Sequence, residues 1–246
     1  MLSTETLTYG AVRRDYQHHE FPEEVLLDHY AKAVSPLLTP LFVRCKVTPN
    51  GVTVIMIVSG VLGALLFAIP WMPSRICGAL FIQLWMILDC CDGEVARITR
   101  VFSKFGTQMD YLAHVICHPL FCAAFASALL ALHRYNSTLI LYTALLGVSA
   151  EMLVRHFVAL SETFQVARGN AAAAPEQRSQ LRTIVSRLLG IAFIYPNFAL
   201  LFPLAYLVDY YRGTSIAFYF LIAQACLSFL VAARQAIFWT KVLYRT

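Results

Sequence analysis

The sequence predicts an all-α integral membrane protein with six transmembrane helices and an N-terminal amphipathic helix at the membrane interface. Of its 246 residues, 59% are hydrophobic and only 13% are charged, whereas soluble domains carry roughly 25% charged residues. Long apolar runs, separated by short polar or proline-containing stretches, give the number of helices. The net charge of +5 suits membrane lipids and anionic substrates. No basic run is long enough for a nucleic-acid footprint, so nucleic acid is not an expected partner.

The polar N-terminal part precedes the apolar runs. Residues 1–22 show no periodic pattern, and we expect a cytosolic tail there. Residues 23–46 carry apolar side chains at helical spacing with charges between them, which is typical of a helix that lies in the interface, bent at Pro36 or Pro40. A soluble helix that binds a partner is the alternative, and the span that follows directly favours the interface. Residues 47–246 form the predicted transmembrane domain.

The ends of the apolar runs place the six spans. Pro49 is tolerated at the beginning of the first helix. The apolar part of the second, from Ser74 to Leu88, gives about 20 Å of helix, which is too short for a hydrocarbon core of ~30 Å. The polar residues 89–97 must therefore complete this crossing. The other predicted spans are residues 48–69, 103–132, 138–160, 185–208 and 214–239.

The polar stretch that completes the second span carries the candidate chemistry. In a helix Asp89 and Asp92 lie on one face, at positions i and i+3. Asp110 and His114 repeat this arrangement at i and i+4 on the next helix. A hairpin of the two helices would bring three carboxylates and an imidazole together. Because ionisable groups are costly in a membrane, such a cluster is read as a functional site.

An oxygen-rich cluster of this kind requires cations. Mg²⁺ and Mn²⁺ bind carboxylate oxygens and usually share them with substrate phosphates. Gly93, Ala96 and Gly106 are small enough for a second helix or a diphosphate to approach the backbone. Arg97 is the natural counter-charge to a phosphate oxygen.

The spacing DxxDGxxAR, followed after eight residues by GxxxD, resembles the signature of the CDP-alcohol phosphatidyltransferase family, integral membrane enzymes of phospholipid synthesis. The matching residues are Asp89, Asp92, Gly93, Ala96, Arg97, Gly106 and Asp110. The resemblance implies that the first three Asp bind two divalent cations. A fourth Asp in the family pattern is the implied base that deprotonates the acceptor hydroxyl, and here His114 holds its position.

His114 has three readings. An imidazole has an ordinary pKa near neutrality and acts well as a general base, so His114 can take over the role of the fourth Asp. It can also be a metal ligand, which would favour Mn²⁺ or another transition ion over Mg²⁺. The third reading is that the base, and activity with it, has been lost. The intact remainder of the motif favours an active enzyme.

The resemblance implies transfer of a phosphoalcohol group from a CDP-linked donor to an alcohol acceptor with release of CMP. Relatives use either CDP-diacylglycerol with a soluble alcohol or a CDP-headgroup with a lipid alcohol; the sequence does not separate the two, and CDP-diacylglycerol is the favoured donor. The resemblance further implies that Gly93, Ala96, Arg97 and Gly106 line the cytidine diphosphate, and relatives are often homodimers. One rival is an inactive member that binds CDP-lipids or partners. A second is a transporter, which the clustering of the charges at one end of two helices disfavours.

Two further arginines are candidates for phosphate binding. Arg155 lies inside the fourth apolar run and needs a partner, either Glu151 four residues earlier or an anionic acceptor or lipid phosphate. Arg182 and Thr183, just before the fifth span, resemble a basic element that faces a substrate phosphate in several relatives. Lys and Arg concentrate in the N-terminal region, the second and fourth connections and the C-terminal end. The positive-inside rule therefore places both termini and the motif in the cytosol.

Overall fold

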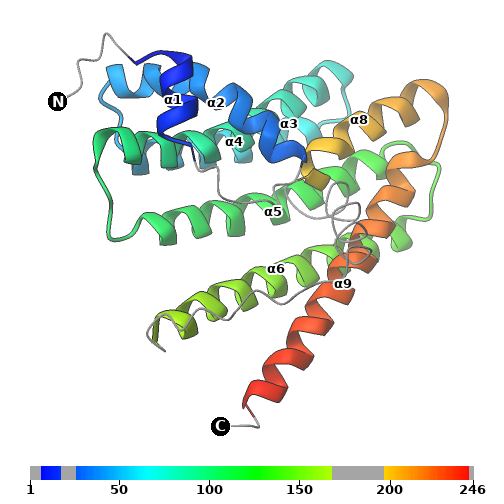
Figure 1. Ribbon diagram of the computed structural model, residues 1–246. Helices are drawn as coiled ribbons and strands as arrows, with labels where there is room; N and C mark the ends of the chain where they lie inside the picture. The colour runs from blue at the N-terminus through cyan, green and yellow to red at the C-terminus, as the bar shows by residue number, and fades with distance from the viewer. Residues whose placement is uncertain (1–6, 18–25, 168–196, 244–246) are drawn as a thin grey trace. The chain divides into compact units, whose positions relative to one another are not determined.

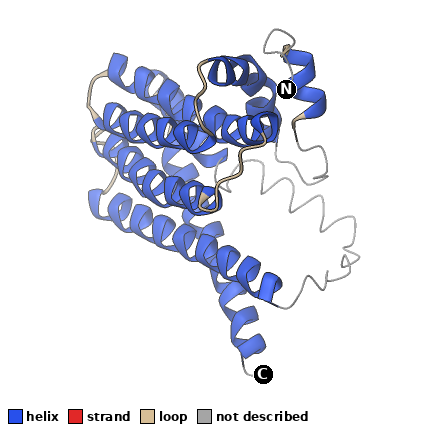
Figure 2. Ribbon diagram, turned by 90° about the vertical axis from the view of Figure 1, so that its left-hand side faces the viewer, coloured by secondary structure: helices blue, strands red, loops and turns tan. Residues whose placement is uncertain are grey.

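The computed structural model describes residues 7–17, 26–167 and 197–243, and all secondary structure in these ranges is helical (Figure 2). The chain divides into two compact units, Met1–Ala128 and Leu129–Thr246. The helices are labelled in Figure 1. The first unit holds α1 (Tyr9–Asp15), α2 (Leu26–Arg44), α3 (Pro49–Ala68), α4 (Met72–Thr99) and nearly all of α5 (Gly106–Leu130). The second unit holds α6 (Ser137–Ala167), α8 (Asn197–Arg212) and α9 (Ile216–Leu243).

Five helices in the described residues are long and apolar enough to cross a membrane: α3, α4, α5, α6 over Ser137–Phe157 and α9 over Ile216–Thr240. The predicted class, an all-α multi-pass membrane protein, is confirmed. The predicted fifth span, residues 185–208, begins outside the described residues, and α8 covers its remainder with 16 residues. The count of six spans therefore stays a prediction, as does the placement of α2 in the interface.

Helix α4 contains the whole polar motif. It runs without interruption for 28 residues from Met72 to Thr99, which corresponds to roughly 42 Å of helix. The structure therefore confirms that the second span continues as a helix through Asp89 to Arg97. The helix ends at Arg100, whose backbone is in the left-handed region with φ 56°. A short connection then leads to α5.

Glycines allow α3 and α4 to pack with their backbones close together. A Cβ added at Gly78 of α4 would lie 2.5 Å from the backbone nitrogen of Phe67 and 2.7 Å from the carbonyl oxygen of Gly63, both on α3. Side-chain hydroxyls join the two helices on either side of this contact. Ser59 donates to the carbonyl of Phe81 at 2.9 Å, and Ser74 donates to the carbonyl of Leu66 at 2.8 Å.

Gly78→Ala is expected to destabilise the first unit, because the new methyl group meets backbone atoms that cannot move independently. Overpacking of this kind costs about 1–3 kcal/mol. Thermal unfolding in detergent measures the change, with Gly10→Ala in α1 as the control, since a Cβ there meets nothing within 4 Å. Equal melting temperatures for the two variants would show that α3 and α4 can separate without cost.

Helix α5 packs beside this pair through aromatic and small side chains. A Cβ at Gly60 of α3 would collide with the thiol of Cys117 and would lie 2.7 Å from the Trp85 ring. The Trp85 ring contacts Phe121 edge to face, with centroids 5.3 Å apart. Trp85, Cys117 and Phe121 are fully buried. This contact holds the middle of α5 against Trp85 at the middle of α4, and the half of α4 that follows contains the motif.

The N-terminal helices also belong to the first unit. Helix α1 occupies part of the predicted tail and is capped at its N-terminus by Thr8, whose Oγ1 accepts the backbone N–H of Ala11 at 3.3 Å. Helix α2 runs through Pro36 and Pro40 as one helix. It buries Ala31, Ser35 and Thr39 on one face and exposes Tyr30, Leu37 and Leu41. Since the exposed side chains are apolar and the buried ones small or polar, this pattern supports the predicted interfacial position.

In the second unit, Asp209 at the end of α8 caps α9. Its buried carboxylate accepts the backbone N–H groups of Ile216 at 2.7 Å and Ala217 at 2.8 Å, and the hydroxyl of Thr214 at 2.6 Å. Helices α6 and α9 approach closely at Gly147, where an added Cβ would lie 2.8 Å from Oε1 of Gln224.

Candidate functional site

Two carboxylates and one imidazole converge where α4 and α5 pack side by side. Nε2 of His114 lies 3.4 Å from Oδ1 of Asp89 and 3.5 Å from Oδ1 of Asp110. One ligand atom from each of the three residues lies within 4.8 Å of the others. The hairpin thus brings together three of the four groups that the spacing placed on facing surfaces.

The donor set of this cluster fits a divalent cation. Carboxylate oxygens suit Mg²⁺ and Mn²⁺, and an imidazole nitrogen adds preference for a transition ion. Asp89 and Asp110 are partly exposed whereas His114 is buried, so the cluster opens on its carboxylate side. An incoming phosphate could therefore share an ion held by these carboxylates.

His114 is held from behind by buried rings. Its Nδ1 lies 3.2 Å from Nε2 of His118, which is fully buried. The Trp85 ring contacts both imidazoles edge to face, with centroids 5.2 Å from His114 and 5.5 Å from His118. These contacts point Nε2 of His114 at the two carboxylates. His118 therefore contacts His114 and does not belong to the three-residue cluster.

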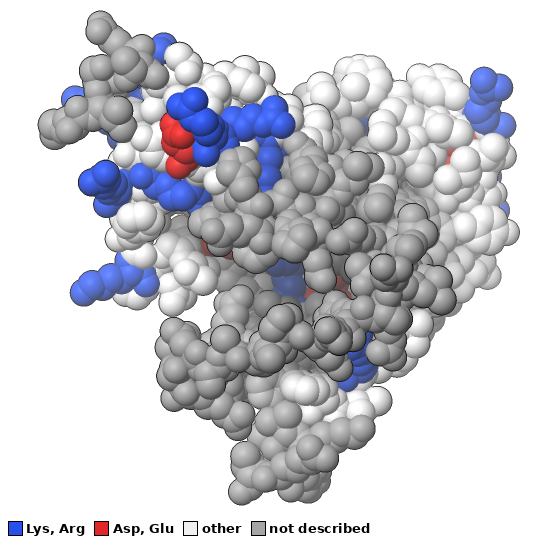
Figure 3. All heavy atoms as spheres, viewed as in Figure 1, with Lys and Arg blue, Asp and Glu red and all other residues white. Residues whose placement is uncertain are grey.

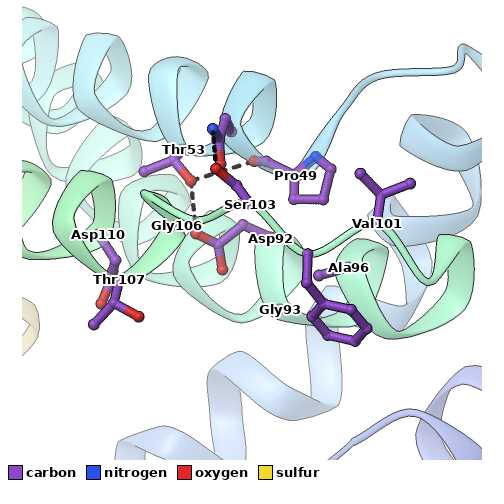
Figure 4. Close-up of a pocket in the computed structure, with 12 residues that line it drawn as sticks. Pro49, Thr53, Asp92, Gly93, Ala96, Val101, Ser103, Gly106, Thr107 and Asp110 are labelled. Carbon is purple, nitrogen blue, oxygen red and sulfur yellow. Dashed lines mark hydrogen bonds between the residues drawn. The ribbon is translucent and has the colours of Figure 1, made fainter.

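Asp92, the fourth predicted group, faces a cavity next to the cluster. Its Oδ2 accepts the hydroxyl of Thr53 at 2.9 Å, and this hydroxyl also lies 3.2 Å from the carbonyl of Pro49 (Figure 4). The cavity has a volume of about 300 Å³. It is lined by Pro49, Asn50, Thr53, Asp92, Gly93, Ala96, Val101, Phe102, Ser103, Gly106, Thr107 and Asp110. Asp110 belongs to both the cavity and the cluster, which joins them into one site.

The small residues predicted from the motif line the cavity. Gly93 and Ala96 of α4 and Gly106 of α5 all line it (Figure 4). A Cβ at Gly106 would meet only the Cβ of Ser103, at 3.8 Å. The connection between α4 and α5 is joined to α3 by a hydrogen bond from Asn50 Nδ2 to Ser103 Oγ at 3.1 Å. The first turns of α3 and α5 and the last turns of α4 thus surround one hollow.

The three predicted arginines lie in different places. Arg97 follows the cavity-lining Ala96 on α4, and its Nε donates to the backbone carbonyl of Tyr16. Arg155 is in the second unit, where its Nε lies 3.4 Å from Oε1 of the buried Glu151, so the pairing within α6 is present. Arg182 lies outside the described residues.

Two contacts of motif residues in the first unit were not predicted from the sequence, one made by Thr53 and one made by Glu94. Thr53, a polar residue one turn into an apolar helix, binds Asp92. Glu94, at a position that the motif leaves unspecified, is buried and accepts hydrogen bonds from α2 and from Gln17. A polar residue inside an apolar run was an available signal for Thr53. No pattern linked Glu94 to its partners.

Comparisons with known proteins cover the residues of this site. A family model described as CDP-alcohol phosphatidyltransferase matches residues 46–243, which include the cluster and the cavity. A bifunctional IPC transferase and DIPP synthase from Thermococcus kodakarensis is 32% identical over 130 residues. The aligned region makes up 52% of this chain and 27% of that protein, so the chain matches about a quarter of the relative's length.

Proposed function

Because this chain belongs to the CDP-alcohol phosphatidyltransferase family, we propose that it transfers a phosphatidyl group from CDP-diacylglycerol to an acceptor hydroxyl and releases CMP. Membership supports the coarser statement that the protein is a membrane transferase of phospholipid biosynthesis. The observation that carries the proposal is the convergence of Asp89, Asp110 and His114 beside a cavity that Asp110 also lines. Carboxylates and an imidazole beside a hollow suit transfer of a phosphoryl group between two oxygens.

The three aspartates are the proposed metal ligands. Asp89, Asp92 and Asp110 would hold two divalent cations, Mg²⁺ or Mn²⁺, and their carboxylate oxygens fit these ions. When bound, such ions neutralise the charge of the diphosphate and of the leaving CMP. The hydroxyl of Thr53 fixes the orientation of Asp92 through its hydrogen bond. Gly93, Ala96 and Gly106 leave room for the cytidine diphosphate, and Arg97 supplies a positive charge next to Gly93.

His114 is the proposed general base. Its Nε2 faces Asp89 and Asp110, and its Nδ1 faces His118. A neutral imidazole with the proton on Nδ1 can donate to His118 and keeps Nε2 as the acceptor for the proton of the attacking hydroxyl. The protonated ring would then be stabilised by the two carboxylates that it faces.

The orientation of the protein in the membrane is part of the proposal. Figure 3 shows Lys and Arg side chains gathered over the part of the first unit that holds α1, whereas most of the other described surface on this face is uncharged. The distribution supports a cytosolic motif and cytosolic termini by the positive-inside rule.

Arg155 and Arg182 are proposed to bind a charged or phosphorylated acceptor. Because Arg155 is paired with Glu151, it would meet such an acceptor as part of an ion pair.

A panel of acceptors tests the proposed function. Purified protein with CDP-diacylglycerol and a divalent metal is expected to release CMP only when the matching alcohol is present, among serine, inositol, inositol phosphate and glycerol phosphate. Arg155→Leu is expected to raise the acceptor KM about tenfold, by loss of a charge-assisted contact. An unchanged KM would remove Arg155 from the acceptor site. Turnover restricted to CDP-headgroup donors with a lipid alcohol would reverse the assignment of donor and acceptor.

A further inference from the structure

A buried carboxylate on α4 faces the N-terminal helices. Glu94 is 1% exposed and is absent from the residues that line the cavity. Its Oε1 accepts the hydroxyl of Ser35 at 2.5 Å, and its Oε2 accepts the hydroxyl of Thr39. Ser35 and Thr39 lie one turn apart on the buried face of α2. Helix α2 therefore presents two hydroxyls to one carboxylate of the motif helix.

A third donor to Glu94 comes from the segment after α1. Nε2 of Gln17 lies 2.7 Å from Oε1 of Glu94 and 2.6 Å from the backbone carbonyl oxygen of Lys32. One amide group thus bridges α2 and α4. Tyr16, the preceding residue, accepts the Nε–H of Arg97 with its backbone carbonyl. Consecutive residues of the N-terminal segment therefore bind positions 94 and 97, which lie one turn apart on α4.

The contact at Tyr16 orients Arg97 over the edge of the cavity. A Cβ added at Gly93 would lie 3.0 Å from Nη1 and 3.3 Å from Nη2 of Arg97. The guanidinium therefore lies across Gly93, which lines the cavity. Its Nε side is held by Tyr16 and its Nη side is next to the hollow. Without a hydrogen bond at Nε, this long side chain would sample other rotamers at the mouth of the site.

The burial of the Glu94 carboxylate between α4 and the N-terminal segments calls for a physical explanation. Burying a charge is costly unless hydrogen bonds satisfy it, and an apolar side chain of similar volume often gives equal or greater stability. Glu94 meets the first condition through three donors from two separate segments. Such a group specifies which polar surface packs against α4. Here the specified surface is α2 together with the segment that follows α1.

We infer that Gln17, acting through Glu94 and Tyr16, is a positioning residue that holds Arg97 over Gly93 for the donor diphosphate. The inference rests on the proposed function, since it names what Arg97 is held for. It assigns to Tyr16 and Gln17 a role in donor binding, although they lie outside the region matched by the family model. A variant that breaks this link is expected to weaken donor binding while the cluster around His114 stays intact.

Gln17→Ala tests the inference. The variant removes the bridging amide from a partly exposed position, so the transmembrane core is left unchanged. We expect the donor KM to rise about tenfold, because misplacement of a binding group by a fraction of an ångström has effects of this order. The kcat, the acceptor KM and the melting temperature should stay close to those of the wild type. Arg14→Gln on the exposed surface of α1 is the matched control and should leave the donor KM unchanged.

Variants at Glu94 separate positioning from folding. Glu94→Gln keeps an oxygen that can accept from Gln17 and Ser35, and its donor KM is expected to stay within about twofold of the wild type. Glu94→Leu removes every acceptor at this place and is expected to raise the donor KM as Gln17→Ala does. An unchanged donor KM in both Gln17→Ala and Glu94→Leu, with normal wild-type turnover, would overturn the inference alone. A wild-type protein that binds CDP but never releases CMP would overturn the proposed function and the inference with it.

Discussion

Asp110→Asn is expected to lower CMP release about a thousandfold, which corresponds to about 4 kcal/mol of lost transition-state stabilisation. Asp110 is the residue that joins the two parts of the described site. Its Oδ1 lies 3.5 Å from Nε2 of His114, and its side chain lines the cavity beside Asp92. The amide keeps the shape but loses the negative charge that a divalent cation requires. Initial rates of CMP release at saturating donor and metal measure the effect.

The control for this substitution is Asp15→Asn. Asp15 is an exposed carboxylate that pairs with Arg14 at the end of α1, at 2.8 Å, and has no contact with the cluster. The same change of charge there should leave the rate unchanged. If Asp110→Asn kept more than a tenth of the wild-type rate over a wide range of metal concentrations, Asp110 would not be a ligand. The cluster would then be a structural ion network.

His114→Ala is expected to lower kcat about a hundredfold, the usual size of a general base contribution. The methyl group leaves Asp89 and Asp110 in place and removes the nitrogen that lies 3.4 Å and 3.5 Å from them. Because the proposed metal ligands remain, the donor KM should change much less than kcat. His156→Ala, an exposed histidine on α6, is the matched control. Full turnover in His114→Ala would show that the base is another group.

His114→Asp separates the three readings of this position. The substitution restores the residue that the family pattern has at the fourth place. An active wild type with a partly active His114→Asp supports a base that either side chain can supply. An inactive wild type with an active His114→Asp would mean that the fold is intact and the base has been lost. The metal preference adds a further test, since a ligating imidazole in the wild type should favour Mn²⁺ more than Asp does.

The convergence of the cluster could be predicted because it depends on local geometry. The spacing of Asp110 and His114 by four residues fixes their common face on any helix. The apolar part of α4 was too short to span a membrane, and this shortfall correctly predicted that the helix continues through the motif. The spacing did not predict how α4 and α5 pack against each other. In the structure the buried rings of Trp85 and Phe121 form this contact. The register between the two helices could not be predicted from residue spacing along the chain.

The contacts that the sequence did not reveal are long-range. Gln17 and Glu94 are 77 positions apart, and Thr53 and Asp92 are 39 positions apart. Neither pair has a repeat, a fixed spacing or a charge pattern that would connect its members. Helix α1 was missed because a helix of seven residues has no room for a hydrophobic period. Its N-cap Thr8 was the available signal, and a single threonine is too common to predict a helix.

The most direct test of the central claim is the joint appearance of CMP and a labelled lipid product. Purified protein receives CDP-diacylglycerol and an isotopically labelled acceptor, with Mg²⁺ or Mn²⁺ in one sample and a chelator in the other. The account predicts equal amounts of CMP and labelled phospholipid with metal, and neither product with the chelator. CMP release that continues in the chelator, or CDP binding without CMP for every donor and acceptor class, would contradict it.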